Sequence, residues 1–131
     1  MRNFHFELGE LPPEAEALRQ EVREFLRVEL PSHRPDQAVK SAEGFDLEFS
    51  RKVGARGWIG MTWPKQYGGH ERSAFERYVV MEEMLAAGAP LSAHRVADRQ
   101  SGPLILRLGT EEQRQFFLPR IARGTWPLPS A

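Results

Sequence analysis

The side chains in this sequence best suited to catalysis are two adjacent carboxylates, Glu82 and Glu83. Either could act as a general base, a role that requires a carboxylate within hydrogen-bonding reach of the proton it removes. Neighbouring residues on a helix point about 100° apart, however, so the two carboxylates cannot share one reacting centre. We expect both to be solvated or paired with a nearby arginine, such as Arg77 on the same helix. The sequence therefore identifies no catalytic residue.

The histidines and glycines do not form a metal or nucleotide signature. Histidine occurs at positions 5, 33, 70 and 94, and no two have the spacing that aims two imidazoles at one metal ion. Cysteine is absent, which removes thiolate ligands, thiolate nucleophiles and disulfides. The glycine pair Gly68-Gly69 is more typical of a turn than of a phosphate-binding loop. We therefore expect no metal site, and the cofactor-binding residues stay unknown.

A loop rich in glycine and aromatic residues occupies positions 57–69 and contains two tryptophans, a tyrosine and four glycines. Interior glycines cost a helix or strand about 0.5–1 kcal/mol each relative to alanine, so regular structure is not expected here. Buried tryptophan and tyrosine rings each remove about 150–250 Å² from water. We expect a loop that folds tightly around these rings and seals a helical core. A second interpretation is that it also lines a ligand channel.

The rest of the chain predicts helices and no persuasive pair of strands. Helix signals cover about residues 13–30, 46–56, 73–87, 92–108 and 110–118, joined by a surface connection over residues 32–43. Ser73 with Glu76 and Thr110 with Gln113 are capping boxes, in which each side chain pairs with the backbone N–H of the other residue. The fourth segment should be interrupted near Gly102-Pro103, and Pro119 should kink or end the last one near Leu118.

Apolar residues recur at helical spacing and indicate which faces are buried. In the first helix the inward positions are Ala15, Leu18, Val22, Phe25 and Leu26. In the third helix we expect one buried stripe, which consists of Ala74, Tyr78, Met81 and Leu85. This stripe is widened by Phe75, Val79 and Val80. The run Leu104–Leu106 is expected to be buried as well. Gly54 weakens the expectation of a helix over 46–56.

Length and charge place limits on the class of protein. The 131 residues suffice for one domain with a buried core, and 18 basic residues balance 18 acidic ones. This balance gives no net field toward nucleic acid or an anionic membrane. No apolar run has the roughly 20 residues that a membrane span requires, and the first residues lack a secretory signal. We therefore expect a cytoplasmic protein without nucleic-acid or membrane partners.

Four motifs, in this order, resemble the N-terminal domain of acyl-CoA dehydrogenases. They are Gly57-Trp58-Ile59-Gly60 with Trp63-Pro64-Lys65-Gln66-Tyr67-Gly68-Gly69; Glu82-Glu83 with Ala86-Ala87-Gly88-Ala89-Pro90; Ala97-Asp98-Arg99-Gln100 with Gly102-Pro103; and Gly109-Thr110-Glu111-Glu112-Gln113 leading to Phe117-Leu118-Pro119-Arg120-Ile121. Together they extend from about Pro13 to about Trp126.

This resemblance implies an all-α bundle of five to six helices over residues 1–124, with residues 125–131 starting the linker toward a middle β-domain that this sequence lacks. It also implies an oxidoreductase of fatty acid metabolism, a flavoprotein that forms an α,β double bond in acyl-CoA thioesters. In that family the base lies in the C-terminal helical domain, and FAD is held by the middle and C-terminal domains. We therefore expect the chain alone to hold no FAD and to be inactive.

The resemblance further places the segment around Asp98 beside the acyl-chain channel. Val96, Ala97, Gln100 and Leu104 would then share one face and line the substrate pocket, where a small side chain at Ala97 leaves room for ligand carbons. The simpler interpretation of Asp98-Arg99 is a pair on the helix surface, worth about 0–1 kcal/mol.

An alternative function needs no missing domains. The chain could be a free-standing helical interaction module that pairs with a flavin-bearing partner chain or has lost redox function. A domain separated from its neighbours should expose an apolar patch and could self-associate through it. We expect any such patch at Trp126, Leu128 and the loop from Trp63 to Tyr67.

Overall fold

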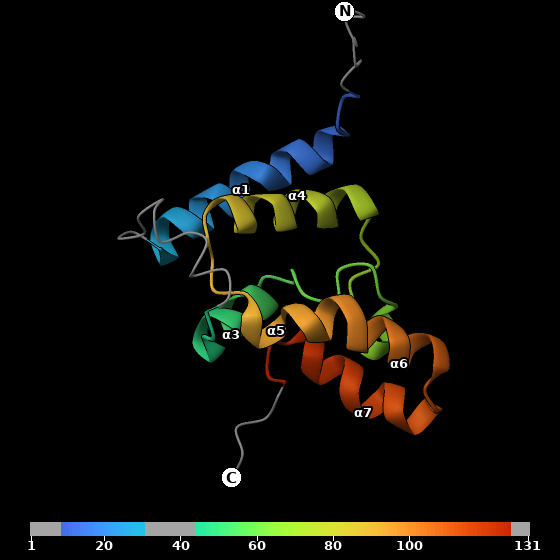
Figure 1. Cartoon of the computed structure of the whole chain (residues 1–131). Coiled ribbons are helices and arrows are strands. Elements are labelled where there is room, and N and C mark those ends of the chain that lie inside the picture. Colours follow the sequence, from blue (N-terminus) through green and yellow to red (C-terminus); the bar gives the residue numbers. More distant parts are fainter. Residues whose placement is uncertain (1–8, 31–43, 127–131) are drawn as a thin grey trace, which may run out of the picture.

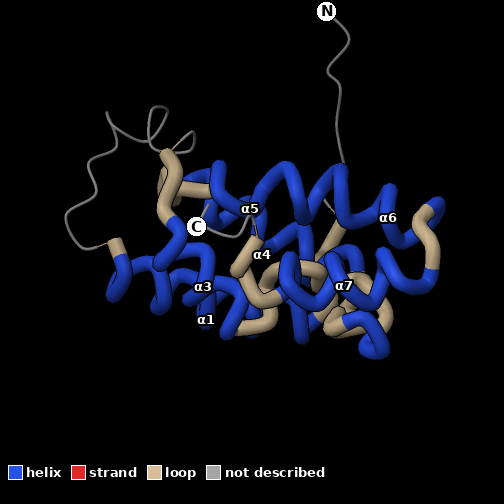
Figure 2. Tube along the Cα trace, turned by 90° about the horizontal axis from the view of Figure 1, so that it is seen from below, coloured by secondary structure: helices blue, strands red, loops and turns tan. Residues whose placement is uncertain are grey.

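The structure, a computed structural model, describes residues 9–30 and 44–126, and every regular element within these ranges is helical (Figure 1, Figure 2). The elements are α1 (Pro13–Glu29), α3 (Leu47–Ala55), η2 (Lys65–Tyr67), α4 (Ala74–Ala86), α5 (Ser92–Val96), η3 (Ala97–Ser101), α6 (Gly102–Leu108) and α7 (Glu111–Ala122). Because α5, the π-helical turn η3 and α6 follow one another directly, we call them together the α5–α6 rod. The predicted all-α bundle of five to six helices is confirmed. The predicted connection over residues 32–43 lies outside the described residues.

The helices form two layers. Figure 1 shows α1 and α4 packed side by side in one layer, while α3, the α5–α6 rod and α7 make up the other. Figure 2, viewed from below, shows α5 and α6 in line. Buried side chains from both layers and from the loop between α3 and α4 join in one hydrophobic core. The loop therefore packs within the fold and connects its two layers.

Local sequence signals explain where the helices begin. Pro13 lies in the first turn of α1, where its missing N–H costs nothing. Asp46 caps α3 by accepting a hydrogen bond from the Phe49 N–H at 2.9 Å. Both predicted capping boxes are present, at the start of α4 and of α7. The five inward positions predicted for α1 are all buried.

The glycine-rich loop encloses the indole ring of Trp63, which is buried as predicted. A Cβ atom on Gly69 would lie 2.2 Å from the Trp63 carbonyl oxygen, and one on Gly102 would lie 2.2 Å from an atom of the Trp63 ring. Gly60 approaches the same ring and has a φ of 64°. Trp58 and Tyr67 are also buried, so the prediction of a loop that seals the core is confirmed.

Two helices continue past residues that were expected to disturb them. α7 runs through Pro119 to Ala122, so the expected end near Leu118 is wrong. Leu118 and Ile121 are buried on either side of the proline, and this burial offsets the roughly 3 kcal/mol that an interior proline costs. α3 passes through Gly54, where a Cβ atom would lie 2.3 Å from the Arg123 backbone. Glycine is therefore needed where α3 meets the end of α7.

The buried face of α4 differs from the predicted stripe. Ala74, Tyr78 and Leu85 are exposed, as is Phe75, and Met81 is half-buried. The residues turned inward are Val79, Val80, Glu83 and Met84. Helix α4 packs along α1, where Arg19 and Arg23 bind Glu83, so a carboxylate occupies a position that apolar periodicity assigns to the surface.

Candidate functional site

The α5–α6 rod carries the four residues predicted to line a pocket. Its π-helical turn, η3, ends just before Pro103. Proline has no backbone N–H, and its ring clashes with the carbonyl group four residues earlier in an α-helix. A π-helical turn, with its i→i+5 pattern, relieves both problems and keeps the rod continuous. The predicted interruption near Gly102-Pro103 is therefore present as a widened turn.

Three of the four predicted wall residues lie on the outer side of this rod. Val96 is 57% exposed and Leu104 is 59% exposed, and Gln100 between them is also exposed. Ala97 is buried, so it lies on the inner side of the rod and not on the face with the other three. The prediction that Leu104–Leu106 is buried is wrong for Leu104, which is exposed, whereas Ile105 and Leu106 are half-buried and pack against the core. Consecutive residues on a helix point in different directions, so the three cannot all face inward.

Asp98 is buried and does not form the surface pair that the simpler interpretation described. Its carboxylate accepts a hydrogen bond from the Gly60 backbone N–H at 2.7 Å, and Arg77 lies 3.5 Å away. Burial raises the pKa of Asp98, while the Gly60 N–H and Arg77 act in the opposite direction. Asp98 thus links the rod to the glycine-rich loop and to α4. Sequence spacing does not reveal this link, because Gly60 and Asp98 are 38 residues apart.

Glu82 and Glu83 pair with arginines of α1 and not with Arg77. One Arg19 nitrogen lies 2.6 Å from Glu83 and 2.8 Å from Glu82, and Arg23 binds both carboxylate oxygens of Glu83 at 3.0 Å. Burial alone would raise the pKa of Glu83, but the hydrogen bonds from Arg23 and Arg19 lower it below its ordinary value. A carboxylate held in this way links two helices and is not free to take a proton from a ligand.

The contacts of His94 and of the Gly68-Gly69 turn show what these residues bind within the described part of the chain. No group of three side chains there could hold a metal ion. The buried His94 ring instead shares a 2.6 Å hydrogen bond with the Ser50 hydroxyl. The N–H groups of Gly68 and Gly69 donate to the carbonyls of Lys65 and Pro64, which occupies them in a turn and leaves neither free for a phosphate group.

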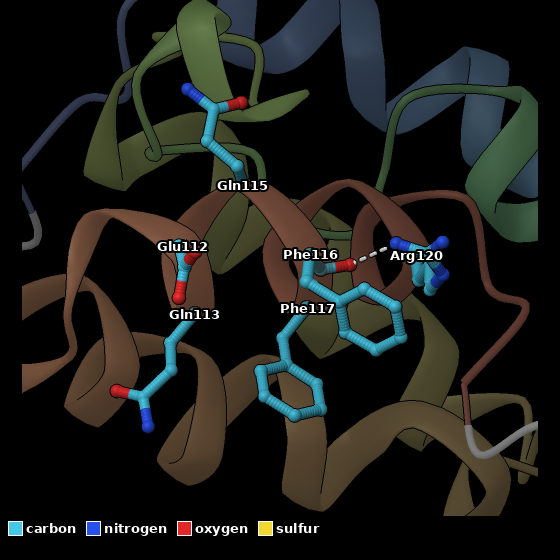
Figure 3. Close-up of a pocket in the computed structure, with 6 residues that line it drawn as sticks. All are labelled: Glu112, Gln113, Gln115, Phe116, Phe117 and Arg120. Carbon is cyan, nitrogen blue, oxygen red and sulfur yellow. Dashed lines mark hydrogen bonds between the residues drawn. The ribbon is translucent and has the colours of Figure 1, made fainter.

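An open hollow of about 590 Å³ lies on α7 (Figure 3). Its lining residues are Glu112, Gln113, Gln115, Phe116, Phe117 and Arg120. The Arg120 guanidinium lies 3.8 Å from the centre of the Phe116 ring and donates to the Phe116 carbonyl, so its charge is already engaged within the helix. No predicted wall residue lines this hollow.

Exposed apolar side chains are not where a patch was expected. Trp63 and Tyr67 are buried, so the expected patch at their loop is wrong. Trp126 is half-buried and packs edge-on against Phe117, and Leu128 lies outside the described residues. Large apolar side chains are instead exposed on α4 and on the α5–α6 rod, where Leu108 is the most exposed at 73%.

The fold and this site define a helical domain in which a buried aromatic loop supports an exposed rod. Residues 12–125 match the family model described as "Acyl-CoA dehydrogenase, N-terminal domain". The chain therefore belongs to the acyl-CoA dehydrogenase family, an oxidoreductase family that is generally FAD-dependent.

Curated relatives are longer than this chain. It is 37% identical over 121 residues to acyl-CoA dehydrogenase FadE26 of Mycobacterium tuberculosis, covering 86% of this chain and 29% of that protein. It is 34% identical over 119 residues to the short-chain specific acyl-CoA dehydrogenase of Clostridium acetobutylicum, covering 87% of this chain and 30% of that protein. The chain thus spans about 30% of the length of the curated relatives it matches.

Solved structures show the same fold. The ChsE4–ChsE5 complex of Mycobacterium tuberculosis contains a chain with a TM-score of 0.70 and 32% identity, covering 90% of this chain and 30% of that one. The Tcur3481–Tcur3483 steroid acyl-CoA dehydrogenase gives 0.74 and 35%, covering 91% of this chain and 31% of that one. In the described part of our chain, no helix is both long and apolar enough to span a bilayer.

Proposed function

We propose that this chain supplies the N-terminal helical domain of an enzyme that forms an α,β double bond in acyl-CoA thioesters. Within that enzyme, Val96, Gln100 and Leu104 contribute to the wall of the acyl pocket, and the small side chain of Ala97 lets the rod pack closely behind them. The observation that carries this proposal is the exposed outer side of the α5–α6 rod, in a domain that matches the family over residues 12–125. Residues 125–131 would begin the linker to a middle domain.

The chemistry of the reaction would come from outside this chain. FAD, when bound in an intact enzyme, accepts the hydride. The two buried carboxylates described above, Glu83 and Asp98, are held by arginines and by the Gly60 N–H, and the glycine turn has no free donors for a phosphate. These residues therefore do not fit a flavin site or a catalytic base, and we assign them to the fold. The role of this domain would be to bind and orient the acyl chain and to exclude water from it. A cytoplasmic location stays a prediction.

A domain exchange tests this proposal. Residues 12–125 would replace the matching segment of the acyl-CoA dehydrogenase of Geobacillus kaustophilus, whose structure gives a TM-score of 0.73 and 28% identity. We expect the chimaera to purify with flavin and to oxidise acyl-CoA, and the 131-residue chain alone to show no turnover with acyl-CoA, FAD and an electron acceptor. A flavin-loaded chimaera that no acyl-CoA reduces, or clear turnover by the chain alone, would contradict the proposal.

A matched pair of variants tests the pocket wall itself. Leu104 and Leu85 are both exposed leucines, but only Leu104 lies on the proposed wall. In the chimaera, Leu104→Ala should change the preference among acyl chain lengths, and Leu85→Ala should leave it unchanged. Equal effects of the two substitutions would remove Leu104 from the wall.

The alternative is a helical module that binds a flavin-bearing partner chain. It is supported by solved structures that contain two different chains and by the exposed side chains of Phe75 and Tyr78 on α4. Tyr78→Ser should then weaken partner binding, whereas under the first proposal it changes neither flavin content nor turnover of the chimaera. Light scattering of the purified chain reports self-association through the same surface.

A further inference from the structure

Helix α4 carries a stripe of exposed side chains on the side that faces away from the core. At 100° per residue, six of its residues lie within about 120° of the helix circumference. They are Ala74, Phe75, Tyr78, Glu82, Leu85 and Ala86, and all six are exposed. We call this surface the α4 stripe. Its three large members, Phe75, Tyr78 and Leu85, are 57%, 55% and 43% exposed, and Glu82 is its one charged member. Such a surface is suited to contact with another protein surface.

The α4 stripe is arranged symmetrically about position 80. Its members form three pairs that lie equally far to either side of this position: Ala74 with Ala86, Phe75 with Leu85, and Tyr78 with Glu82. The outer pair is small, the middle pair is large and apolar, and the inner pair combines a hydroxyl donor with a carboxylate acceptor. When an identical helix packs antiparallel about a two-fold axis at this position, each member lies level with its counterpart on the other helix. The stripe therefore matches a second copy of itself, whereas an unrelated surface would not require this symmetry.

The side chains that meet across such an axis are complementary. Phe75 of one copy lies nearly level with Ala86 of the other, so a large ring has a small side chain beside it. Tyr78 lies level with Glu82 of the other copy and can donate to its carboxylate. Within one chain the Tyr78 oxygen is 3.4 Å from Glu82, which is long for a hydrogen bond, so a closer acceptor would improve it. Each Glu82 is paired with Arg19 of its own chain at 2.8 Å, which offsets the repulsion between the two carboxylates.

We propose that α4 pairs antiparallel with α4 of a second copy of this chain, through the α4 stripe and about a two-fold axis at the level of Val80. The inference goes beyond the proposed function, because it requires neither FAD nor acyl-CoA. It gives α4 a second copy as its partner, where the alternative function gives the same helix a different chain. A helix of 13 residues is only about 20 Å long, so the interface is small. We expect a dissociation constant on the order of 10–100 µM.

Sedimentation equilibrium of the full chain over a concentration series tests the pairing. We expect a reversible equilibrium between monomer and dimer. Leu85→Glu would bury an unpaired charge within the paired stripe and should raise the dissociation constant by at least roughly tenfold. Leu104→Glu is the matched control, because Leu104 is an exposed leucine of α6 outside the stripe, and it should leave the dissociation constant unchanged. Both leucines are exposed, and circular dichroism confirms that both variants are folded.

Cysteine cross-linking tests the antiparallel register. The chain contains no cysteine, so each single-cysteine variant reports one site. A mixture of Ala74→Cys and Leu85→Cys chains, oxidised with copper–phenanthroline, should form a mixed disulfide, because the two sites lie nearly level in the pair. Two Ala74→Cys chains should not cross-link, since their sites would be roughly 18 Å apart along the helices and a disulfide needs Cα atoms within about 7 Å. Leu108→Cys, at an exposed site of α6, measures the background from random collision.

Four results would overturn the inference. A chain that stays monomeric at the highest concentration would leave the α4 stripe to the other domains of the proposed enzyme. A dimer that resists Leu85→Glu, or one that Leu104→Glu weakens equally, would have its interface elsewhere. Cross-linking between two Ala74→Cys chains would show a parallel pair. An active chimaera together with a monomeric chain would remove this inference and leave the proposed function intact, and a dimer together with an inactive flavin-loaded chimaera would do the reverse.

Discussion

The carboxylate of Asp98 lies 2.7 Å from the backbone nitrogen of Gly60, and this hydrogen bond fastens the α5–α6 rod to the loop that encloses Trp63. The Asp98 residue is only 5% exposed, and Arg77 of α4 approaches its other oxygen. Three segments that are distant in the sequence therefore meet at one buried carboxylate. The position of the proposed acyl wall depends on this contact, because Val96 and Gln100 lie on the same stretch of the rod.

Replacing the Asp98 carboxylate should destabilise the fold, and the size of the effect should depend on which of its two partners is left unsatisfied. Asp98→Ala leaves the Gly60 N–H without its acceptor and should lower the free energy of unfolding by about 1–3 kcal/mol. Asp98→Asn keeps an oxygen for the Gly60 N–H and removes only the charge that faces Arg77, so the destabilisation should be smaller. Urea denaturation measures both. Equal destabilisation by the two variants would show that the hydrogen bond to Gly60 contributes little.

A methyl group at Gly102 should disturb the packing of Trp63. The added Cβ atom would lie 2.2 Å from a Trp63 ring atom, so the ring or the rod must move. We expect Gly102→Ala to lower the free energy of unfolding by about 1–3 kcal/mol, the usual cost of an overfilled core. Gly9→Ala is the control, because nothing lies within 4 Å of its Cβ position. Thermal denaturation that shows equal stability for both variants would contradict the described packing.

Helix starts and one helix face could be predicted because they depend on residues close in the sequence. The capping boxes at Ser73 and Thr110 involve partners three residues away, and the buried face of α1 follows a simple period. The glycine-aromatic loop was also recognisable, since its composition excludes regular structure and its rings require burial. The family resemblance could be seen for the same reason: its motifs are short and local.

The errors lie where a distant contact decides the outcome. Glu83 faces inward because Arg19 and Arg23 come from another helix, and this turns the apolar side of α4, including Tyr78, toward the surface. α7 continues past Pro119 because burial on both sides outweighs a local penalty. At the candidate site, Val96 and Leu104 are exposed whereas Ala97 is buried, so the three do not share one face as predicted. Ala97 begins a π-helical turn, which the spacing of apolar residues in the sequence does not reveal.

Neutralising Glu83 should weaken the packing of α1 on α4. Glu83→Gln removes the charge that Arg19 and Arg23 bind and should lower the free energy of unfolding by about 2 kcal/mol at neutral pH, less than for a fully buried pair because Arg23 reaches solvent. The pKa of Glu83 is lowered in the folded state, so its contribution is present above its ordinary pKa of 4.5 and is lost as the pH falls below that value. The measurement is urea denaturation across this range.

The matched control for Glu83 is Glu24. Its pair with Arg27 is exposed on α1 and screened by solvent, so Glu24→Gln should leave the free energy of unfolding nearly unchanged. If Glu83→Gln were as mild as Glu24→Gln, the arginine pair would not contribute to helix packing.

The buried pair of Ser50 and His94 should make the fold sensitive to mild acid. Burial lowers the pKa of His94 from 6.5 to about 4, so the folded protein keeps this ring neutral while the unfolded chain protonates it. Stability from the neutral ring is complete above pH 6.5 and declines as the pH falls toward 4, by a total of about 3 kcal/mol. Urea denaturation of His94→Gln should therefore show a free energy of unfolding that depends less steeply on pH between 4 and 6.5 than that of the unmodified chain. The pKa of His70 is also lowered, by burial and by Arg72 and Lys65, so His70→Gln should reduce this pH dependence to a smaller extent. An unchanged slope in His94→Gln would mean that burial does not keep the His94 ring neutral in the folded protein.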